Sequence, residues 1–214
     1  MDGALVPWEQ AQVHVVSNGF QYGFNAFEGI HCYATARGPA IFRLQDHVRR
    51  LFDSAKILGF EIPFSQEQIA DACVETVRAN KMENCYIRPI AYIGRGGMGL
   101  NYRVAPVNVA IAVWFWGEYL GEGKLKNGVR VQTSGFMRHH VNTHMTKAKA
   151  GGNYLLFQLA RTAAHDAGYD EALLLDQNGL VAEGSVEHVF AVKGGRLITP
   201  PLGFLLDGIT PDTV

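Results

Sequence analysis

The sequence predicts an α+β fold in which helices flank a largely antiparallel sheet, followed by a second part that is rich in strands. In the first half, two stretches at residues 44–58 and 66–80 carry apolar residues at helical spacing among strand-like stretches. A polar, glycine-rich stretch at residues 117–124 interrupts this pattern. Beyond it, a third helical stretch at residues 153–167 precedes three more strand patterns.

This interruption predicts two domains. The 214 residues exceed the usual length of one domain. We expect a small N-terminal α/β domain at residues 1–120, a linker at 121–127, and the first part of a larger, β-rich domain at 128–214. The chain ends with a loop followed by Pro211, a residue that favours the first position of a helix. We therefore expect the second domain to be incomplete.

The three expected helices have recognisable ends. The first, over residues 44–58, is followed by Gly59, and the third, over residues 153–167, is followed by Gly168. The second begins with Ser65–Gln68, which resembles a capping box.

The expected strands are short runs bounded by turn-forming residues. Residues 17–23 and 94–106 are expected to be loops, residues 139–147 irregular, and residues 34–38 a hairpin turn. The strands are expected at residues 4–16 (short strands around a turn), 27–33, 40–43, 84–93, 107–115, 129–134, 171–176, 184–192 and 196–199.

Composition excludes several classes of function. A net charge of -1 argues against a nucleic-acid partner, which needs an excess of Lys and Arg. The three cysteines form no CxxC pair and the eight histidines match no compact ligand motif, so neither a disulfide framework nor a metal site is expected. A reducing cytoplasm fits best. Neither a signal peptide nor an apolar run long enough to cross a membrane is visible.

The segment Thr146–Tyr154 (TKAKAGGNY) sets two lysines beside small residues. A lysine amine is a usable nucleophile only when its pKa is lowered or when it is held as an imine. Small neighbours would let a flat ligand approach the backbone. Taken alone, the segment fits a surface turn better, because lysines are mostly exposed.

Other residues could also carry chemistry. Glu183 lies between two strand patterns, where its carboxylate could act as a general base, pair with a protonated ring nitrogen, or simply be solvated. Ile209-Thr210 precedes a helix start that could bind a phosphate or be an ordinary cap. Arg50 lies on the helix expected at residues 44–58, and without further information its side chain is interpreted as a solvent-exposed charge. Tyr86 and Arg88 share one strand face, and an Arg on a mostly apolar strand needs a carboxylate partner or a ligand.

A glycine-rich motif, Gly94–Gly99, matches G-x-G-x-x-G after a strand pattern. A dinucleotide-binding fold needs this motif to open a helix, and the residues that follow have poor helix signals. We interpret the motif as a flexible loop.

Taken together, Lys149–Tyr154, Glu183–Ser185 and Gly208–Thr210 have the order and spacing found in fold-type IV pyridoxal-phosphate enzymes. The sequence resembles the class IV aminotransferases, and among them the branched-chain amino-acid aminotransferases. This resemblance covers essentially the whole chain. Further segments support the narrower match: Tyr22-Gly23, Phe27–Ile30, His47–Ile57, Tyr86–Pro89 and Trp116–Tyr119.

The resemblance implies a two-domain fold of the D-amino-acid-aminotransferase type and a pyridoxal 5'-phosphate cofactor. Lys149 would bind this cofactor covalently and later shuttle a proton. Tyr154 would donate a hydrogen bond to its phenolic oxygen, and Glu183 would keep its pyridine nitrogen protonated. The phosphate would be held by Arg50, Ile209 and Thr210.

The resemblance also implies one substrate pocket that accepts both an apolar side chain and the side-chain carboxylate of glutamate, with Arg88 binding the carboxylate. The loop Met98–Leu100 would reach the active site of a neighbour, so a homodimer or a hexamer of dimers is expected. The residues that would line the pocket are Tyr22, Phe27, Tyr86, Arg88, Trp116 and Tyr119.

The chain departs from the family pattern in places. His188 stands where Asn is usual, Pro211 stands where a basic residue is usual, and Lys147 makes its segment unusually basic. Family members also extend tens of residues further, and that part would carry another phosphate contact and part of the α-carboxylate site.

The expected activity is a ping-pong transfer of the amino group from an L-branched-chain amino acid to 2-oxoglutarate, which forms L-glutamate. Three related activities remain as alternatives: D-amino-acid transaminase, amine transaminase and aminodeoxychorismate lyase. A non-catalytic binding protein on the same fold is the alternative outside enzymes.

Overall fold

A computed structural model describes the protein at residues 1–97, 99–117, 120–121 and 123–214. The chain divides into two compact units, which are described separately. The first unit comprises Met1–Trp116 together with Ala148–Gly152, and the second comprises Gly117–Lys147 together with Asn153–Val214. The part of the Thr146–Tyr154 segment that carries Lys149 therefore belongs to the first unit, whereas Lys147 belongs to the second.

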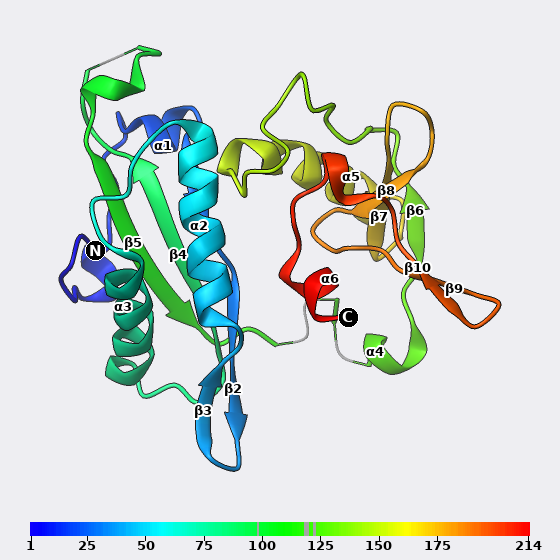
Figure 1. Cartoon of the computed structure of the whole chain (residues 1–214), viewed down its shortest axis with the longest axis horizontal. Coiled ribbons are helices and arrows are strands. Elements are labelled where there is room, and N and C mark those ends of the chain that lie inside the picture. Colours follow the sequence, from blue (N-terminus) through cyan, green and yellow to red (C-terminus); the bar gives the residue numbers. More distant parts are fainter. Residues whose placement is uncertain (98, 118–119, 122) are drawn as a thin grey trace. The chain divides into compact units, whose positions relative to one another are not determined.

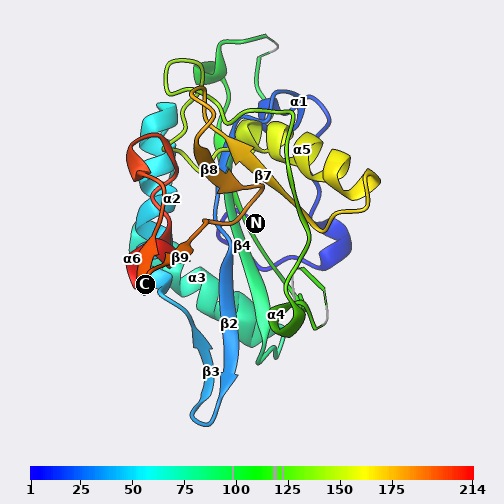
Figure 2. The same ribbon diagram turned by 90° about the vertical axis from the view of Figure 1, so that its right-hand side faces the viewer.

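The first unit is built on an antiparallel sheet (Figure 1). Strand β4 (Cys85–Ile93) lies at its centre. β5 (Val107–Trp114) pairs with β4 along its whole length, while β2 pairs with its first half and β1 with its second half. The β2–β3 hairpin projects from one end of the sheet (Figures 1 and 2). The remaining elements are 3₁₀ helices at Trp8–Gln10 and Tyr102–Val104, α1 (Asn18–Gln21), β1 (Asn25–Phe27), β2 (Ile30–Thr35), β3 (Gly38–Ile41), α2 (Leu44–Leu58) and α3 (Gln66–Ala79).

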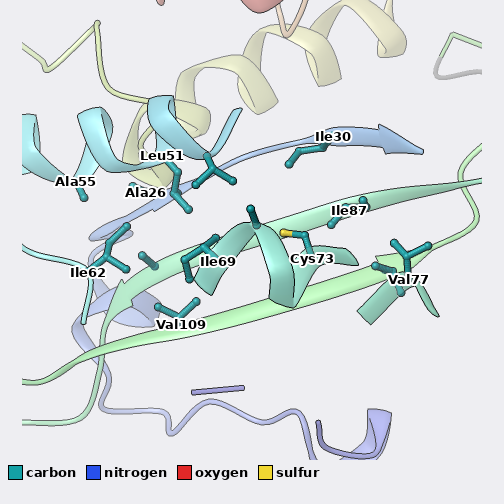
Figure 3. Close-up of a cluster of buried hydrophobic side chains, with 14 of the residues drawn as sticks. Ala26, Ile30, Leu51, Ala55, Ile62, Ile69, Cys73, Val77, Ile87 and Val109 are labelled. Atoms are coloured by element: carbon teal, nitrogen blue, oxygen red, sulfur yellow. The ribbon is translucent and has the colours of Figure 1, made fainter. Parts of the chain in front are cut away.

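Helices α2 and α3 cover one face of this sheet, and their apolar stripes form its core (Figure 3). Leu51 on α2 and Cys73 on α3 are fully buried in the same core cluster as Ile87 of β4. Complete burial of a side chain such as Leu51 contributes about 1.5–3 kcal/mol. Because side chains alternate along a strand, Tyr86 and Arg88 lie on the opposite face of β4, as the sequence predicts.

The start of α3 is fixed by the capping box that the sequence predicts. The Ser65 hydroxyl accepts the Gln68 N–H, and the Gln68 side chain accepts the Ser65 N–H. Ser65→Ala is expected to lower the free energy of unfolding by about 1 kcal/mol, because one N–H at the helix start loses its acceptor. Urea denaturation measures this, with the exposed Gln66→Ala as a control that should change it by less than about 0.5 kcal/mol. Equal stabilities of the Ser65 variant and the parent would contradict the capping role.

The second unit contains a three-stranded sheet in the order β6-β7-β8. β7 (Glu171–Leu175) pairs in parallel with β6 and antiparallel with β8. Helix α5 (Tyr154–Asp166) buries Phe157 and Ala160 against Leu174 of β7. The other elements are α4 (Lys124–Asn127), β6 (Val131–Thr133), a 3₁₀ turn at Gly151–Asn153 that leads into α5, β8 (Val181–Gly184), the β9 (Ala191–Lys193) and β10 (Arg196–Ile198) hairpin, a 3₁₀ helix at Leu202–Phe204 and α6 (Ile209–Thr213).

Four expectations about local structure are wrong. Residues 4–16 contain a 3₁₀ helix and no strand, and their apolar side chains are largely exposed instead of alternating across a sheet. Part of the expected loop at 17–23 forms α1. The expected strand 184–192 is divided between β8 and β9, because the Glu187 carbonyl accepts the Gly184 N–H and closes a turn. Pro211 is the third residue of α6 and not the first.

Several features of the described residues bear on the classes of function. No helix among them is both long and apolar enough to cross a membrane. Within the same ranges, His, Cys, Asp and Glu side chains form no group of three that could hold a metal ion. All three cysteines are buried free thiols.

Candidate active site

Lys149 is held beside β1 by its own backbone. Its N–H donates to the Ser54 hydroxyl at 2.9 Å, and its carbonyl accepts the Phe27 N–H at 3.0 Å. The next residue, Ala150, forms an antiparallel bridge with Ala26. Lys149 lies outside any helix or long strand, yet hydrogen bonds at both its N–H and its carbonyl fix its backbone. A reactive amine needs such a fixed backbone to be held in one position.

The glycines after Lys149 pack closely against the start of β1. A Cβ atom on Gly151 would lie 2.5 Å from the Asn25 side-chain amide. The Gly152 N–H donates to the Gly23 carbonyl at 3.1 Å, and a Cβ on Gly23, whose φ is +65°, would lie 3.2 Å from the Gly152 Cα. The small residues beside the lysine are therefore needed for packing within the first unit.

The Phe27 ring lies next to two cations. The Lys149 ammonium nitrogen is 5.1 Å from the ring centroid, and the Arg88 guanidinium carbon is 4.7 Å from it. Arg88 also lies 5.3 Å from the Tyr86 ring and 5.7 Å from the Trp114 ring. Cation–π contacts hold both positive groups without consuming their hydrogen-bond donors. Within the described residues, the buried Arg88 Nε has no hydrogen-bond acceptor, so it can donate to an anionic ligand.

Tyr86 is enclosed by aromatic rings and by a glycine. Its ring centroid lies 5.0 Å from that of His31, 5.3 Å from that of Trp114 and 4.6 Å from that of Trp116. A Cβ on Gly29 would be only 1.7 Å from the Tyr86 hydroxyl oxygen, so this close approach requires glycine. Sequence reasoning missed His31, although strand alternation with Ile30 and Cys32, which face the core, could have placed it on this face.

Arg50 is not the solvated charge that its sequence context suggests by default. Its Nε and Nη2 atoms donate to the two carboxylate oxygens of the buried Glu28, at 2.6 and 2.8 Å. The same carboxylate contacts His47 Nδ1 at 2.7 Å and accepts the Gly29 N–H at 3.2 Å. Burial raises the pKa of Glu28, but the hydrogen bonds from His47 and Arg50 outweigh it and bring the pKa to about 2. The orientation of the Arg50 guanidinium is therefore fixed.

The second unit holds the expected partners Tyr154 and Glu183. Glu183 on β8 forms an ion pair with Arg138, whose side chain is buried. The Arg138 guanidinium lies 5.0 Å from the Phe157 ring centroid, and Tyr154 contacts the same ring edge-to-face at 5.2 Å. Sequence reasoning missed Arg138, because it lies in an irregular stretch and no fixed spacing links it to Glu183.

Ile209 and Thr210 begin α6, with Ile209 buried and Thr210 exposed. The loop before this helix is tied down by Lys147. Its ammonium group donates to the Leu202 carbonyl at 2.5 Å and to the Asp207 carboxylate at 2.7 Å. Lys147, the first and unusual lysine of the TKAKAGGNY segment, is therefore an anchor for this loop.

The remaining expected residues divide as follows. Tyr22 and Trp116 belong to the first unit. Tyr119 and Met98 lie outside the described residues. A cavity of about 550 Å³ in the first unit is lined by residues such as Leu44 and Val77 and contains none of the expected site residues, so we do not assign the chemistry to it.

Comparison with known proteins decides the family. The family model described as amino-transferase class IV matches residues 25–214. The chain belongs to the class IV aminotransferase family. The resemblance found in the sequence is thus confirmed.

This class IV aminotransferase is similar to known relatives over its whole length. It is 47% identical to the branched-chain-amino-acid aminotransferase of Pseudomonas aeruginosa, covering 100% of this chain and 69% of the relative. The solved branched-chain amino acid aminotransferase of Escherichia coli is 43% identical, with a TM-score of 0.95 and coverage of 99% of this chain and 70% of that one. A further solved branched-chain amino acid aminotransferase, complexed with N-(5'-phosphopyridoxyl)-L-glutamate, is 45% identical, with a TM-score of 0.94 and coverage of 100% and 70%. The expected two-domain fold of fold-type IV enzymes is confirmed.

Proposed function

We propose that the protein transfers the amino group of an L-branched-chain amino acid to 2-oxoglutarate, which gives a branched 2-oxo acid and L-glutamate. The observation that carries this proposal is the fixed amine of Lys149 beside the Phe27 ring and Arg88. The names of the relatives support the branched-chain donor, and the glutamate adduct bound to one of them supports the acceptor. We further propose that the protein works in the cytoplasm as a homodimer at least.

The residues present fit a pyridoxal 5'-phosphate cofactor. When bound, this group supplies an electron sink that makes the Cα–H of an amino acid acidic. Lys149 provides a fixed amine for its carbonyl carbon, and Glu183 provides a carboxylate that can pair with a protonated pyridine nitrogen. Tyr154 would hydrogen-bond its phenolic oxygen. The residues assigned to the phosphate are Arg50, Ile209 and Thr210.

Side chains of the protein carry out proton transfer and substrate binding. The Nζ atom of Lys149 is the base that takes the proton from the substrate Cα and returns it. Aromatic walls at Phe27 and Tyr86, together with Trp116, suit a branched apolar side chain. Arg88 can bind the side-chain carboxylate of glutamate from within those walls, because its buried Nε donor has no acceptor among the described residues. Tyr22 and Tyr119 are assigned to the same substrate pocket.

Lys149→Ala is expected to remove the visible absorbance of the lysine-bound cofactor and to reduce transamination below detection. Lys147→Arg is the matched control, because it replaces a lysine two residues away and keeps a cation for the contacts with Leu202 and Asp207. The control should keep both the absorbance and the turnover. Absorbance and turnover that persist in the Lys149 variant would contradict the proposal.

A substrate panel tests the donor class. With 2-oxoglutarate as acceptor, we expect turnover of L-leucine to exceed that of D-alanine and of a simple amine. A preference for D-alanine or the amine would assign the protein to one of the alternative activities of the same family.

A further inference from the structure

We propose that Glu171 and Glu187 share one proton, and that this acid–carboxylate pair holds the turn that follows Glu183. Glu171 and Glu187 are then positioning residues for Glu183. The importance of Glu183 rests on the proposed function, whereas the shared proton does not.

The two carboxyl groups hold the turn from opposite sides. Glu171, the first residue of β7, accepts the Ser185 N–H at 3.3 Å and the Ala172 N–H at 2.7 Å through its Oε1 atom. The Glu187 side chain accepts the Val186 N–H at 3.3 Å, and the Glu187 carbonyl accepts the Gly184 N–H at 2.8 Å. Residues 184–187 are thus bound by these two glutamates.

One buried oxygen on each glutamate shows where a proton is needed. Glu171 Oε2 and Glu187 Oε1 are buried, and neither accepts a hydrogen bond from the described residues. The two carboxyl groups nevertheless contact each other as hydrogen-bond partners. Ionised carboxylates only accept hydrogen bonds, so a bond between two of them requires that one carries a proton. The negative charge of Glu171 also disfavours ionisation of Glu187.

Among the described residues, the cation that contacts the pair is Arg161, which can balance one of the two carboxylates. From α5, Arg161 Nη1 lies 3.4 Å from Glu171 Oε2. His188, the residue after Glu187, adds no dependable positive charge, because burial lowers its pKa. Glu183 itself is paired with Arg138. The positive charge of Arg161 therefore balances one carboxylate, and a proton neutralises the other.

The direction of the pH dependence follows from Glu187. Burial, followed by the charge of Glu171, raises the pKa of Glu187 from 4.5 to about 7. Because the folded protein then holds this proton more tightly than the unfolded chain, the pair contributes stability that is fully present below pH 4.5. That contribution is lost as the pH rises through about 7. Loss of the proton loosens the turn at residues 184–187, which directly follows Glu183. The backbone of Glu183 pairs with Leu174 in the β7–β8 ladder.

Glu187→Gln tests the shared proton, because an amide donates to Glu171 at every pH. The free energy of unfolding of the parent, measured in urea from pH 5 to 9, should fall across pH 5–8 relative to that of the variant. Unfolding at pH 6 should release about one proton fewer per chain from the variant than from the parent. Asp166→Asn, which removes an exposed carboxylate on α5, should follow the parent in both measurements.

A second variant and a binding measurement complete the test. Glu171→Gln should also flatten the pH profile, and each Gln variant should lose the infrared band of the protonated carboxyl group. Affinity for pyridoxal phosphate should fall from pH 6 to 8 more in the parent than in Glu187→Gln. If no pyridoxal phosphate binds at all, the proposed function fails while the proton measurements still stand. Equal proton release and parallel pH profiles for the parent and Glu187→Gln would overturn the inference, since both groups would then be ionised.

Discussion

Replacing Glu28 with alanine is expected to lower the free energy of unfolding by about 3–5 kcal/mol, the usual cost of removing one partner of a buried ion pair. The variant leaves the Arg50 guanidinium and the His47 ring inside the first unit without the carboxylate that both contact. Urea denaturation at pH 7 measures the loss. Affinity for pyridoxal phosphate should fall as well, because Arg50 is no longer held in one orientation.

The matched control for this variant is Glu75→Ala, which removes an exposed carboxylate from α3 of the same unit and should change stability by less than about 0.5 kcal/mol. The pH dependence gives an independent check. The pKa of Glu28 in the folded protein, about 2, lies below the 4.5 of the unfolded chain. Its contribution is therefore present above pH 4.5 and is lost as the pH falls towards 2. A Glu28 variant as stable as the parent at pH 7 would show that the network does not hold the unit together.

Gly29→Ala is expected to lower kcat/KM for L-leucine by about 100-fold, the scale of effect that a 1 Å displacement in an active site can have. The new methyl group would lie 1.7 Å from the Tyr86 hydroxyl oxygen and 2.6 Å from the adjacent ring carbon, so the ring has to move. Tyr86 contacts Trp116, and it lies beside Arg88. The displacement therefore disturbs the proposed substrate pocket directly. Steady-state kinetics with L-leucine and 2-oxoglutarate measure the effect.

Gly135→Ala controls for the general effect of adding a methyl group. Its Cβ would meet no atom within 4 Å, and its backbone does not need the left-handed region. This control should retain the activity of the parent. An unchanged kcat/KM in the Gly29 variant would mean that Tyr86 lies outside the substrate pocket.

Local signals in the sequence predicted helices α2, α3 and α5 well. The apolar spacing of α2 and the left-handed Gly59 that ends it act within a few residues of each other, as does the Ser65–Gln68 capping box. The two-residue period of β4 likewise placed Tyr86 and Arg88 on one face. These features depend on neighbours along the chain, which a sequence displays directly.

The contacts that complete the candidate site depend on residues far apart in the chain. Glu28 and Arg50 are 22 positions apart, and Arg138 and Glu183 are joined by no repeating spacing. Which carboxylate an arginine meets is decided by how helices and strands pack, and periodicity carries no information about it. The expected strand at 184–192 failed for a different, local reason, because Glu187 closes a turn with Gly184 that the alternation of apolar residues conceals.

The assignment of Ala148–Gly152 to the first unit has a consequence for synthesis. A ribosome makes residues 1–116 first, yet the segment that bridges Ala26 is made only after residues 117–147. The first unit therefore cannot reach its final form during translation until part of the second has left the ribosome. Until then, the polar backbone groups of Phe27 at the edge of β1 lack their partner on Lys149, which exposes a strand edge to other chains. Nascent chains stalled before residue 148 should consequently be more prone to aggregation than those stalled after residue 152.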